Sequence, residues 1–209
     1  MAAIAVPLIV PVLLGSVRCD RQRIRAAHLI VATLHARGHE PVLIDPLQLP
    51  LTSLDQMYKE HPRGEAPDAL ERLATLYHQA DGFMIVSAEY NKDISPALKN
   101  LLDYFLEDYF WRLLGIVCYS ARQFGGVLAA MQLRMTLAEL GMPSVPSLFP
   151  TPRISQALGE DGTPRDEKTG GALDKFLAEF CWMRAPRSVN GWRAGPIDSG
   201  MMPASSLPL

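Results

Sequence analysis

The chain has 209 residues, of which 48% are apolar and 20% charged, and its formal net charge is −2. This composition is typical of a globular protein that is long enough to bury one large core. Because the net charge is close to zero, we expect no general affinity for polyanions and no nucleic-acid partner.

In chain order, apolar runs typical of buried strands alternate with segments whose apolar residues recur at helical spacing. The predicted strands are 7–15, 40–45, 82–87, 114–120 and, more weakly, 143–149. The predicted helices are 22–36, 66–80, 96–110, 126–140 and 171–183. Residues 46–66 contain several prolines and predict a long irregular connection.

This alternation predicts an α/β fold, a flavodoxin-like three-layer sandwich around a five-stranded parallel sheet in the order 2-1-3-4-5. We expect residues 1–184 to form one domain. Residues 185–209 are rich in Pro, Gly and Ser and predict a flexible tail.

The beginning and the cysteines of the chain bear on its compartment. The apolar opening, residues 2–14, lacks a basic start, contains two prolines and is too short to span a bilayer. We therefore expect a buried strand there and no membrane partner. Cys19, Cys118 and Cys181 are odd in number and far apart, which argues against a disulfide framework and favours the reducing cytoplasm.

In open α/β sheets, ligands bind beyond the carboxyl ends of the strands, where the winding reverses. In the predicted order this point lies between strands one and three. The loops that follow strands one, three and four are therefore the candidate binding loops: 15–23, 87–95 and 119–126.

The first loop places cations where a helix should begin, which the helix dipole disfavours unless an anion joins them. Ser16, Arg18 and Arg21 combine a hydroxyl and two guanidinium groups with the free N–H groups of a helix start, which suits a phosphate. The alternative is a solvated helix face, which we expect for Arg23 and Arg25. A single glycine excludes the common dinucleotide and NTPase phosphate loops.

The other two loops suit a flat heterocycle. Tyr90 lies between Glu89 and Asn91 at the end of a strand, where backbone groups are available to a ring and the tyrosine covers part of it. Gly125 and Gly126 permit close approach of the backbone to a ligand. Each loop also fits a structural turn, with the tyrosine filling a gap or the glycines beginning a helix.

Together, "GSVR", "AEYN" followed by "SPALKNLLD", and "SARQFGG" resemble the NADPH-dependent FMN reductase family over roughly residues 6–183. The resemblance implies a flavodoxin-like flavoenzyme with FMN as cofactor and NADPH or NADH as co-substrate. It also implies an FMN-binding domain over 1–184. The implied phosphate residues are Ser16, Arg18, Arg21 and Gln22. The implied ring and ribityl contacts are Ser87, Ala88, Glu89, Tyr90, Asn91, Ser120, Gly125 and Gly126.

The chain departs from the family pattern at several loop positions. Ala88 stands where many members have Pro, and Arg21 and Arg23 stand where Ser and Asn are common. Arg122 stands where glycine is frequent. Ala88 bears on the stiffness of its loop, and Arg21 and Arg23 bear on the contacts to the phosphate. Arg122 bears on access to the flavin ring or on recognition of the nicotinamide phosphate.

For such a flavoenzyme the cofactor supplies the chemistry, so we assign no catalytic side chain. We expect a ping-pong cycle with a small-molecule acceptor such as a flavin, a quinone or an azo compound. The family is generally dimeric or tetrameric, and the aromatic stretch 104–111 predicts a helix at the interface of a homodimer or homotetramer.

Other functions have less support in the sequence. Gly38 interrupts the helix between His35 and His39, and no third ligand is apparent, so we expect no metal site. The G-x-S-x-G motif of hydrolases is absent. Glu107 and Asp108 are adjacent in a predicted helix and point apart. The alternative from another class is a flavodoxin-like electron carrier or regulatory module without enzyme activity.

Overall fold

The computed structural model describes residues 6–18, 24–49 and 51–184. Its strands are β1 (Ile9–Leu14), β2 (Glu40–Ile44), β3 (Gly82–Ala88), β4 (Leu113–Tyr119) and β5 (Phe149–Thr151). Its α-helices are α1 (Ile24–Ala36), α2 (Asp68–Gln79), α3 (Pro96–Asp103), α4 (Val127–Glu139), α5 (Ile154–Ala157) and α6 (Glu167–Arg184). Short 3-10 turns occupy Pro46–Gln48, Tyr58–Glu60 and Glu107–Tyr109.

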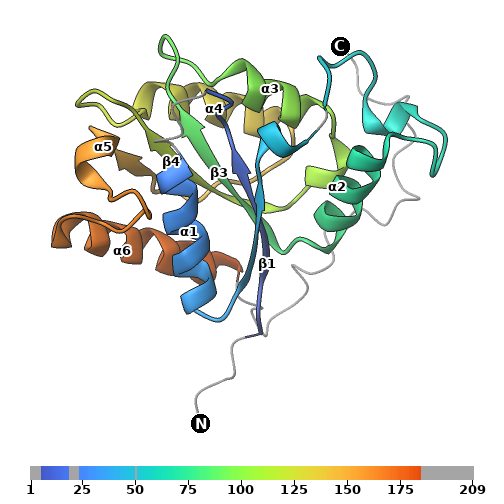
Figure 1. Ribbon diagram of the computed structural model, residues 1–209. Helices are drawn as coiled ribbons and strands as arrows, with labels where there is room; N and C mark the ends of the chain where they lie inside the picture. The colour runs from blue at the N-terminus through green and yellow to red at the C-terminus, as the bar shows by residue number, and fades with distance from the viewer. Residues whose placement is uncertain (1–5, 19–23, 50, 185–209) are drawn as a thin grey trace.

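The five strands form one parallel sheet in the order β2-β1-β3-β4-β5, so the predicted fold class and strand order are confirmed (Figure 1). The central strands β3 and β4 are buried along their whole length, as expected of strands covered on both faces. Pro11, which lacks an N–H, lies just before the β1–β3 ladder, which starts at Val12 opposite Met84.

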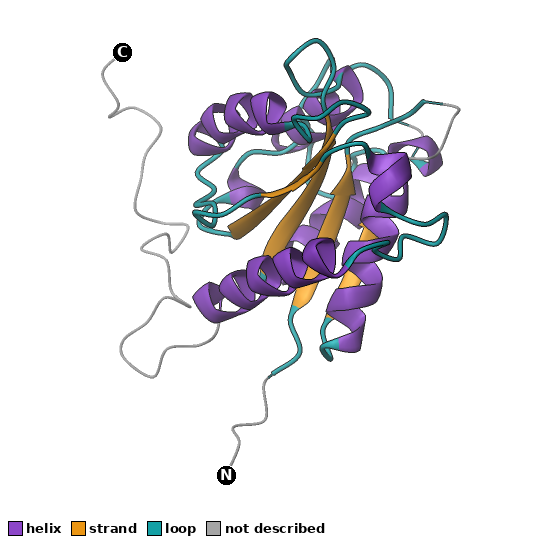
Figure 2. Ribbon diagram, turned by 90° about the vertical axis from the view of Figure 1, so that its left-hand side faces the viewer, coloured by secondary structure: helices purple, strands orange, loops and turns teal. Residues whose placement is uncertain are grey.

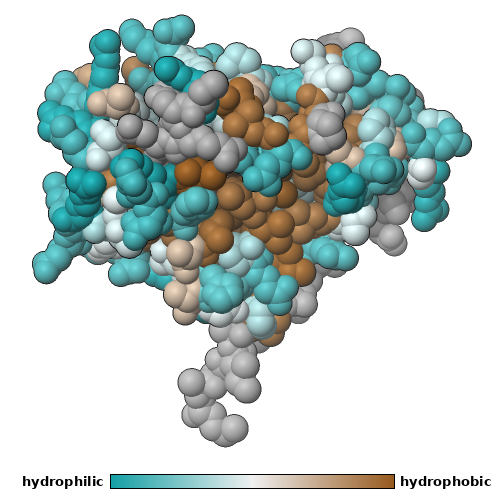
Figure 3. Space-filling view, in the orientation of Figure 1, coloured by the Kyte–Doolittle hydropathy of each residue, from teal (hydrophilic) through white to brown (hydrophobic). Residues whose placement is uncertain are grey.

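Helices cover both faces of the sheet (Figure 2). On one face, strand residues such as Val12 and Val117 pack against Ile30 of α1 and Leu177 of α6. On the other face, the core joins the sheet to α2, α3 and α4; its strand members include Ile85. The outer edge at β2 is less covered, and apolar side chains gather in the centre of that side of the molecule (Figure 3).

The predicted helix 96–110 is wrong in its second half. α3 ends at Asp103, and residues 107–109 form a 3-10 turn. Tyr104, Phe105 and Tyr109 are buried in the core, where Phe105 and Tyr109 pack against Tyr77 of α2. The spacing of these residues would continue the buried face of α3, yet Phe105 and Tyr109 reach the core from backbone outside that helix. The rings of Tyr104, Phe105 and Tyr109 therefore belong to the core and the stretch is not one helix, while Trp111 is exposed and an interface there stays a prediction.

Two further boundaries differ from the prediction. The fifth strand is Phe149–Thr151 instead of 143–149, and within the earlier run Ser144 makes an isolated bridge to Leu114. The last helix begins at Glu167, four residues before the predicted start. The predicted tail 185–209 lies outside the described residues, so the domain boundary at 184 stays a prediction. Among the described helices, none has the length and apolar character needed to cross a membrane.

Candidate functional site

The three candidate loops meet at one edge of the sheet because β1, β3 and β4 are neighbours and run in parallel. Backbone hydrogen bonds hold their beginnings together. The Gly15 N–H donates to the Val86 carbonyl at 2.9 Å, and the Glu89 N–H donates to the Tyr119 carbonyl at 3.2 Å. The ligand loops that the sequence predicts therefore start from a fixed frame.

In the first loop, Ser16 is buried and Arg18 is exposed. The Ser16 hydroxyl lies 3.3 Å from the Tyr90 hydroxyl, which joins the first loop to the second. A hydroxyl and a guanidinium two residues apart supply donors of the kind that bind a phosphate. Arg21 and Gln22, the other two predicted phosphate residues, lie outside the described residues.

Ser95 connects the first loop to α3. Its buried hydroxyl accepts a hydrogen bond from the Leu98 N–H at 3.1 Å and donates one to the Gly15 carbonyl. The first bond is the helix cap that the Ser-Pro pair predicts. The second bond spans 80 residues of sequence and has no local signal. Ser95 thus fixes the beginning of the first loop without belonging to it.

The second loop is a tight turn. The Tyr90 N–H donates to the Asp93 carbonyl at 2.8 Å, and the Asp93 N–H donates to the Tyr90 carbonyl at 3.0 Å. Asn91 and Lys92, between them, have φ angles of 52° and 70°, in the left-handed region. The N–H groups of these two residues donate to no acceptor within the described part of the chain, so they are available to a ligand.

The end of β3 offers a ligand backbone groups and one hydrogen-bond acceptor, the Glu89 carboxylate. The side chains of Ser87 and Ala88 are buried within the sheet, so a ligand meets their backbone rather than their side chains. Glu89 has a buried Oε2 atom with no hydrogen-bond partner among the described residues. Burial, and next the negative charge of Glu89, raise the pKa of the Cys118 thiol to about 12. Cys118 is therefore a protonated core residue and not a nucleophile.

The third loop packs against the segment after β5. The Ser120 N–H donates to the Thr151 carbonyl at 3.2 Å, and the Ser120 hydroxyl donates to the Arg122 carbonyl at 2.9 Å. Gly126 caps α4 with a φ angle of 85°, and a Cβ there would lie 2.7 Å from the Tyr119 nitrogen. Gly125 is likewise left-handed, at 64°. Both glycines thus serve the turn before α4 and keep the backbone of this loop bare of side chains.

The segment after β5 also borders the site, and it is not among the binding loops that the sequence predicts. The Arg153 N–H donates to the Arg122 carbonyl at 3.1 Å, and the Ile154 N–H donates to the Ser120 carbonyl at 3.2 Å. Arg153 has a φ angle of 45°. The predicted strand order points to the loops after strands one, three and four, so the segment after the fifth strand is not among the predicted binding loops.

Arg25 was expected on a solvated helix face, and this expectation is wrong. The side chain is buried, its guanidinium donates to the Leu158 carbonyl at 3.1 Å, and it lies 3.6 Å from the Glu160 carboxylate. Gly162 approaches the same helix so closely that a Cβ would meet the Arg25 carbonyl at 2.6 Å. The start of α1 is therefore held by residues 158–162.

Two of the histidines in the described residues have ordinary partners. His39 Nε2 lies 3.3 Å from the Cys181 thiol, and His78 lies 2.7 Å from the Asp108 carboxylate. No group of three or more His, Cys, Asp or Glu side chains within the described residues is placed to hold a metal ion.

Several known proteins resemble this chain in sequence. It is 27% identical to a quinone reductase of Pseudomonas putida over 140 residues, which cover 64% of the chain and 75% of the relative. It is 31% identical to an NAD(P)H-dependent FMN reductase of Schizosaccharomyces pombe over 136 residues, covering 63% of the chain and 62% of the relative.

Solved structures share the fold. FerB of Paracoccus denitrificans, a flavoenzyme NAD(P)H:(acceptor) oxidoreductase, superposes with a TM-score of 0.68 at 21% identity, covering 86% of this chain and all of its own. The apo form of the NADH:FMN oxidoreductase EMOB superposes with a TM-score of 0.65 at 16% identity, covering 87% and 92%. The sequence pattern of one family matches residues 9–155, a span that contains all three candidate loops. The chain belongs to the NADPH-dependent FMN reductase family.

Proposed function

We propose that this chain binds FMN across the carboxyl ends of β1, β3 and β4 and uses it to pass a hydride from NAD(P)H to a small-molecule acceptor. Family membership makes the chain an oxidoreductase with FMN as cofactor and NAD(P)H as co-substrate. One observation supports the assignment to this site most directly: the Ser16 and Tyr90 hydroxyls lie 3.3 Å apart. This contact joins the loop that we propose for the FMN phosphate to the loop that we propose for the flavin ring.

The residues of the site fit FMN in their chemistry. Ser16 and Arg18, with Arg21 and Gln22 proposed beside them, offer donors to a phosphate. The N–H groups of Asn91 and Lys92 suit the carbonyl oxygens of a flavin ring. The orphaned carboxylate oxygen of Glu89 accepts from an N–H, and a flavin ring carries one.

The remaining predicted contacts have narrower roles in this proposal. Ser87, Ala88 and Ser120 would contact the ring through backbone groups. Gly125 and Gly126 would line it without side chains.

When bound, FMN supplies two-electron chemistry at its N5 atom between a nicotinamide and an acceptor. We propose that NAD(P)H and the acceptor occupy the same open side of the site in turn, in a ping-pong cycle. No side chain needs to move a proton while the hydride arrives. The Tyr90 hydroxyl, held beside Ser16, is our candidate for giving a proton to a quinone or azo acceptor in the second half of the cycle.

The identity of the electron acceptor, the oligomeric state and the cellular compartment are also part of the proposal. Relatives named as quinone reductases and as an azoreductase support a free quinone or azo compound beside free flavin. We propose a homodimer or homotetramer in the cytoplasm, without a membrane or nucleic-acid partner. The alternative, an electron carrier or regulatory module, would bind FMN or a partner without steady NADPH oxidation.

The test begins with the visible spectrum of the purified protein with and without FMN, followed by NADPH under anaerobic conditions. We expect flavin absorbance that travels with the protein and bleaches with NADPH, and steady NADPH oxidation once a quinone is added. Failure to bind FMN would contradict the assignment. Bleaching without steady turnover on any free acceptor would favour the carrier.

A variant pair locates the site. Arg18→Ala should weaken FMN binding by roughly 10- to 100-fold, since a hydrogen bond to a charged group contributes about 1.5–3 kcal/mol. Arg72→Ala is the matched control, because Arg72 is exposed on α2 and is not one of the loop residues. Equal FMN affinity in both variants would remove Arg18 from the phosphate site.

A further inference from the structure

Two arginines lie on adjoining backbone segments at the border of the candidate site. Arg122 belongs to the loop after β4, and Arg153 follows β5. The Arg153 N–H donates to the Arg122 carbonyl at 3.1 Å, and the Ser120 hydroxyl donates to the same carbonyl at 2.9 Å. The Arg153 carbonyl in turn accepts from the Gln156 N–H at 2.7 Å. The backbones that carry the two guanidinium groups are therefore fixed relative to each other.

Neither arginine has a counterion in the part of the chain that the structure describes. Both side chains are exposed, and no ion pair between described residues includes either of them. The sequence contains no Asp or Glu in residues 109–138 or 140–159, so the segments around the two arginines supply no carboxylate. Two cations on adjoining backbones repel each other, and a shared anion would reverse this cost. The pair therefore suits a phosphate monoester, which guanidinium groups bind through paired hydrogen bonds.

The backbone of Arg153 adds a second indication of a ligand. Its φ angle is 45°, in the left-handed region that favours glycine. An arginine there has a cost in backbone energy, and outliers of this kind are concentrated at ligand-binding and catalytic sites. A bound anion would offset the cost, because it would interact with the guanidinium that glycine lacks.

An exposed aromatic ring lies beside the two arginines. Phe124 is 65% exposed and stands two residues after Arg122. Its loop contacts the segment after β5 again at Gly125, where a Cβ would lie 3.0 Å from the Pro152 nitrogen. The two segments therefore meet both before and after Phe124 in the sequence. Nucleobases stack on exposed aromatic rings, so this ring and the two guanidinium groups match an adenosine that carries a phosphate.

We propose that Arg122 and Arg153 bind the 2′-phosphate of NADPH, with Phe124 against the adenine, so that this chain prefers NADPH to NADH. This step rests on the proposed function, in which the FMN phosphate lies at the loop after β1. With the β1 side of the flavin occupied by that phosphate, a dinucleotide whose nicotinamide stacks on the ring extends toward β5, where both arginines lie. Arginine is also the residue that accommodates a 2′-phosphate in dinucleotide-binding folds.

Calorimetric titration of the full chain, with and without FMN, tests the phosphate site directly. The probes are adenosine 2′,5′-bisphosphate and adenosine 5′-monophosphate, which differ only in the 2′-phosphate. We expect the bisphosphate to bind roughly 10-fold more tightly or better, since hydrogen bonds to a charged group contribute at least that factor. Equal affinities, or no binding of either probe at millimolar concentration, would overturn the proposal.

Substitutions assign the parts of the site. Arg122→Gln and Arg153→Gly should each remove most of the preference for the bisphosphate. Glycine suits the φ angle of residue 153, so Arg153→Gly should keep its Tm. Phe124→Ala should instead weaken both probes by a similar factor, because both contain adenine. A folded Arg153→Gly variant that keeps the full preference would refute the role of this arginine.

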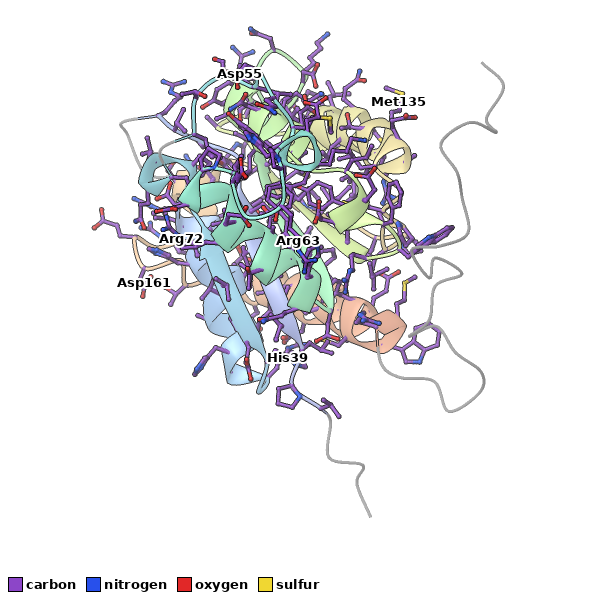
Figure 4. All side chains as sticks on the ribbon, turned by 90° about the vertical axis from the view of Figure 1, so that its right-hand side faces the viewer. His39, Asp55, Arg63, Arg72, Met135 and Asp161 are labelled. Atoms are coloured by element: carbon purple, nitrogen blue, oxygen red, sulfur yellow. The ribbon has the colours of Figure 1, made fainter. Side chains whose placement is uncertain are left out.

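The matched control is Arg72→Gln, which removes an exposed guanidinium from α2. Figure 4 faces α2 and labels Arg72, and α5, which follows Arg153, lies on the opposite side of the molecule (Figure 1). This variant should bind both probes as the unchanged protein does. An equal loss of preference in Arg72→Gln would mean that overall charge, and not the arginine pair, selects the bisphosphate.

Anaerobic reduction of bound FMN separates this proposal from the proposed function. The rate of flavin bleaching at increasing NADPH or NADH concentration gives a Kd for each nucleotide, apart from the limiting rate. We expect a lower Kd for NADPH with similar limiting rates, because the 2′-phosphate is remote from the hydride that is transferred. Bleaching by both nucleotides with the same Kd would refute only the arginine site. Selective binding of the bisphosphate by a protein that binds no FMN would refute only the flavin site.

Discussion

Ser95→Ala should destabilise the protein far more than the loss of one small hydroxyl suggests. The hydroxyl is buried and has two partners, the Leu98 N–H, which it caps, and the Gly15 carbonyl, to which it donates. Loss of a helix cap costs about 1 kcal/mol. A buried carbonyl left without its donor costs about 1–3 kcal/mol more. We therefore expect the free energy of unfolding to fall by about 2–4 kcal/mol, which lowers Tm by roughly 4–16 °C in a domain of this size.

Urea denaturation followed by far-UV circular dichroism measures this change. Ser155→Ala is the control, since Ser155 is exposed and forms no hydrogen bond with the described residues, and its effect should stay within about 0.5 kcal/mol. If Ser95→Ala unfolds within 0.5 kcal/mol of the unchanged protein, Ser95 does not anchor the first loop. FMN affinity measured on the folded variant should also fall, because the frame of the Gly15 loop is then held by fewer bonds.

Three further results are expected. Arg25→Met should lower the free energy of unfolding by about 1.5–3 kcal/mol, since the Leu158 carbonyl loses a charged donor; an unchanged urea midpoint would refute this. Burial, and next the charge of Arg37, hold the pKa of His39 below its ordinary value of 6.5, so the folded protein resists protonation there more than the unfolded chain does. The resulting stability is complete above pH 6.5 and is lost as the pH falls below it, and the fall in Tm between pH 7.5 and pH 5 should shrink in His39→Gln. Cys118 should react with Ellman's reagent at pH 8 only after denaturation, and rapid modification of the native protein, located by peptide mass spectrometry, would contradict its burial.

The fold could be predicted because its signals are local. Each buried strand is a short apolar run, and each helix repeats its apolar residues at helical spacing, so order and type follow from the sequence. The predicted boundaries are wrong where the burial of a residue depends on partners that are distant in the sequence. Tyr104, Phe105 and Tyr109 continue a helical pattern, but their partner Tyr77 lies on another helix. Of the run 143–149, only Phe149 belongs to the paired edge strand, whose extent is set by its pairing with β4.

The candidate site was also predictable in part: its loops follow from the sequence, but the bonds that anchor them do not. Its three loops follow from strand order alone, since parallel strands bring their carboxyl ends together. The bonds that tie the loops to the fold were not predictable, because the partners are remote in sequence. Ser95 and Gly15 are 80 residues apart, and Arg25 and Leu158 are 133 residues apart. Arg25 looks like a surface cation until the loop that buries it is known.

These two remote bonds have an evolutionary consequence. Residues 16–23 lie between Gly15, held by Ser95, and the start of α1, held by residues 158–162. The bonds that secure the ends of this segment are therefore made with residues elsewhere in the chain. Selection can therefore exchange an exposed residue of the described part of this segment, such as Val17, with little change in the free energy of folding. A substitution at such a position needs no compensating change in the core.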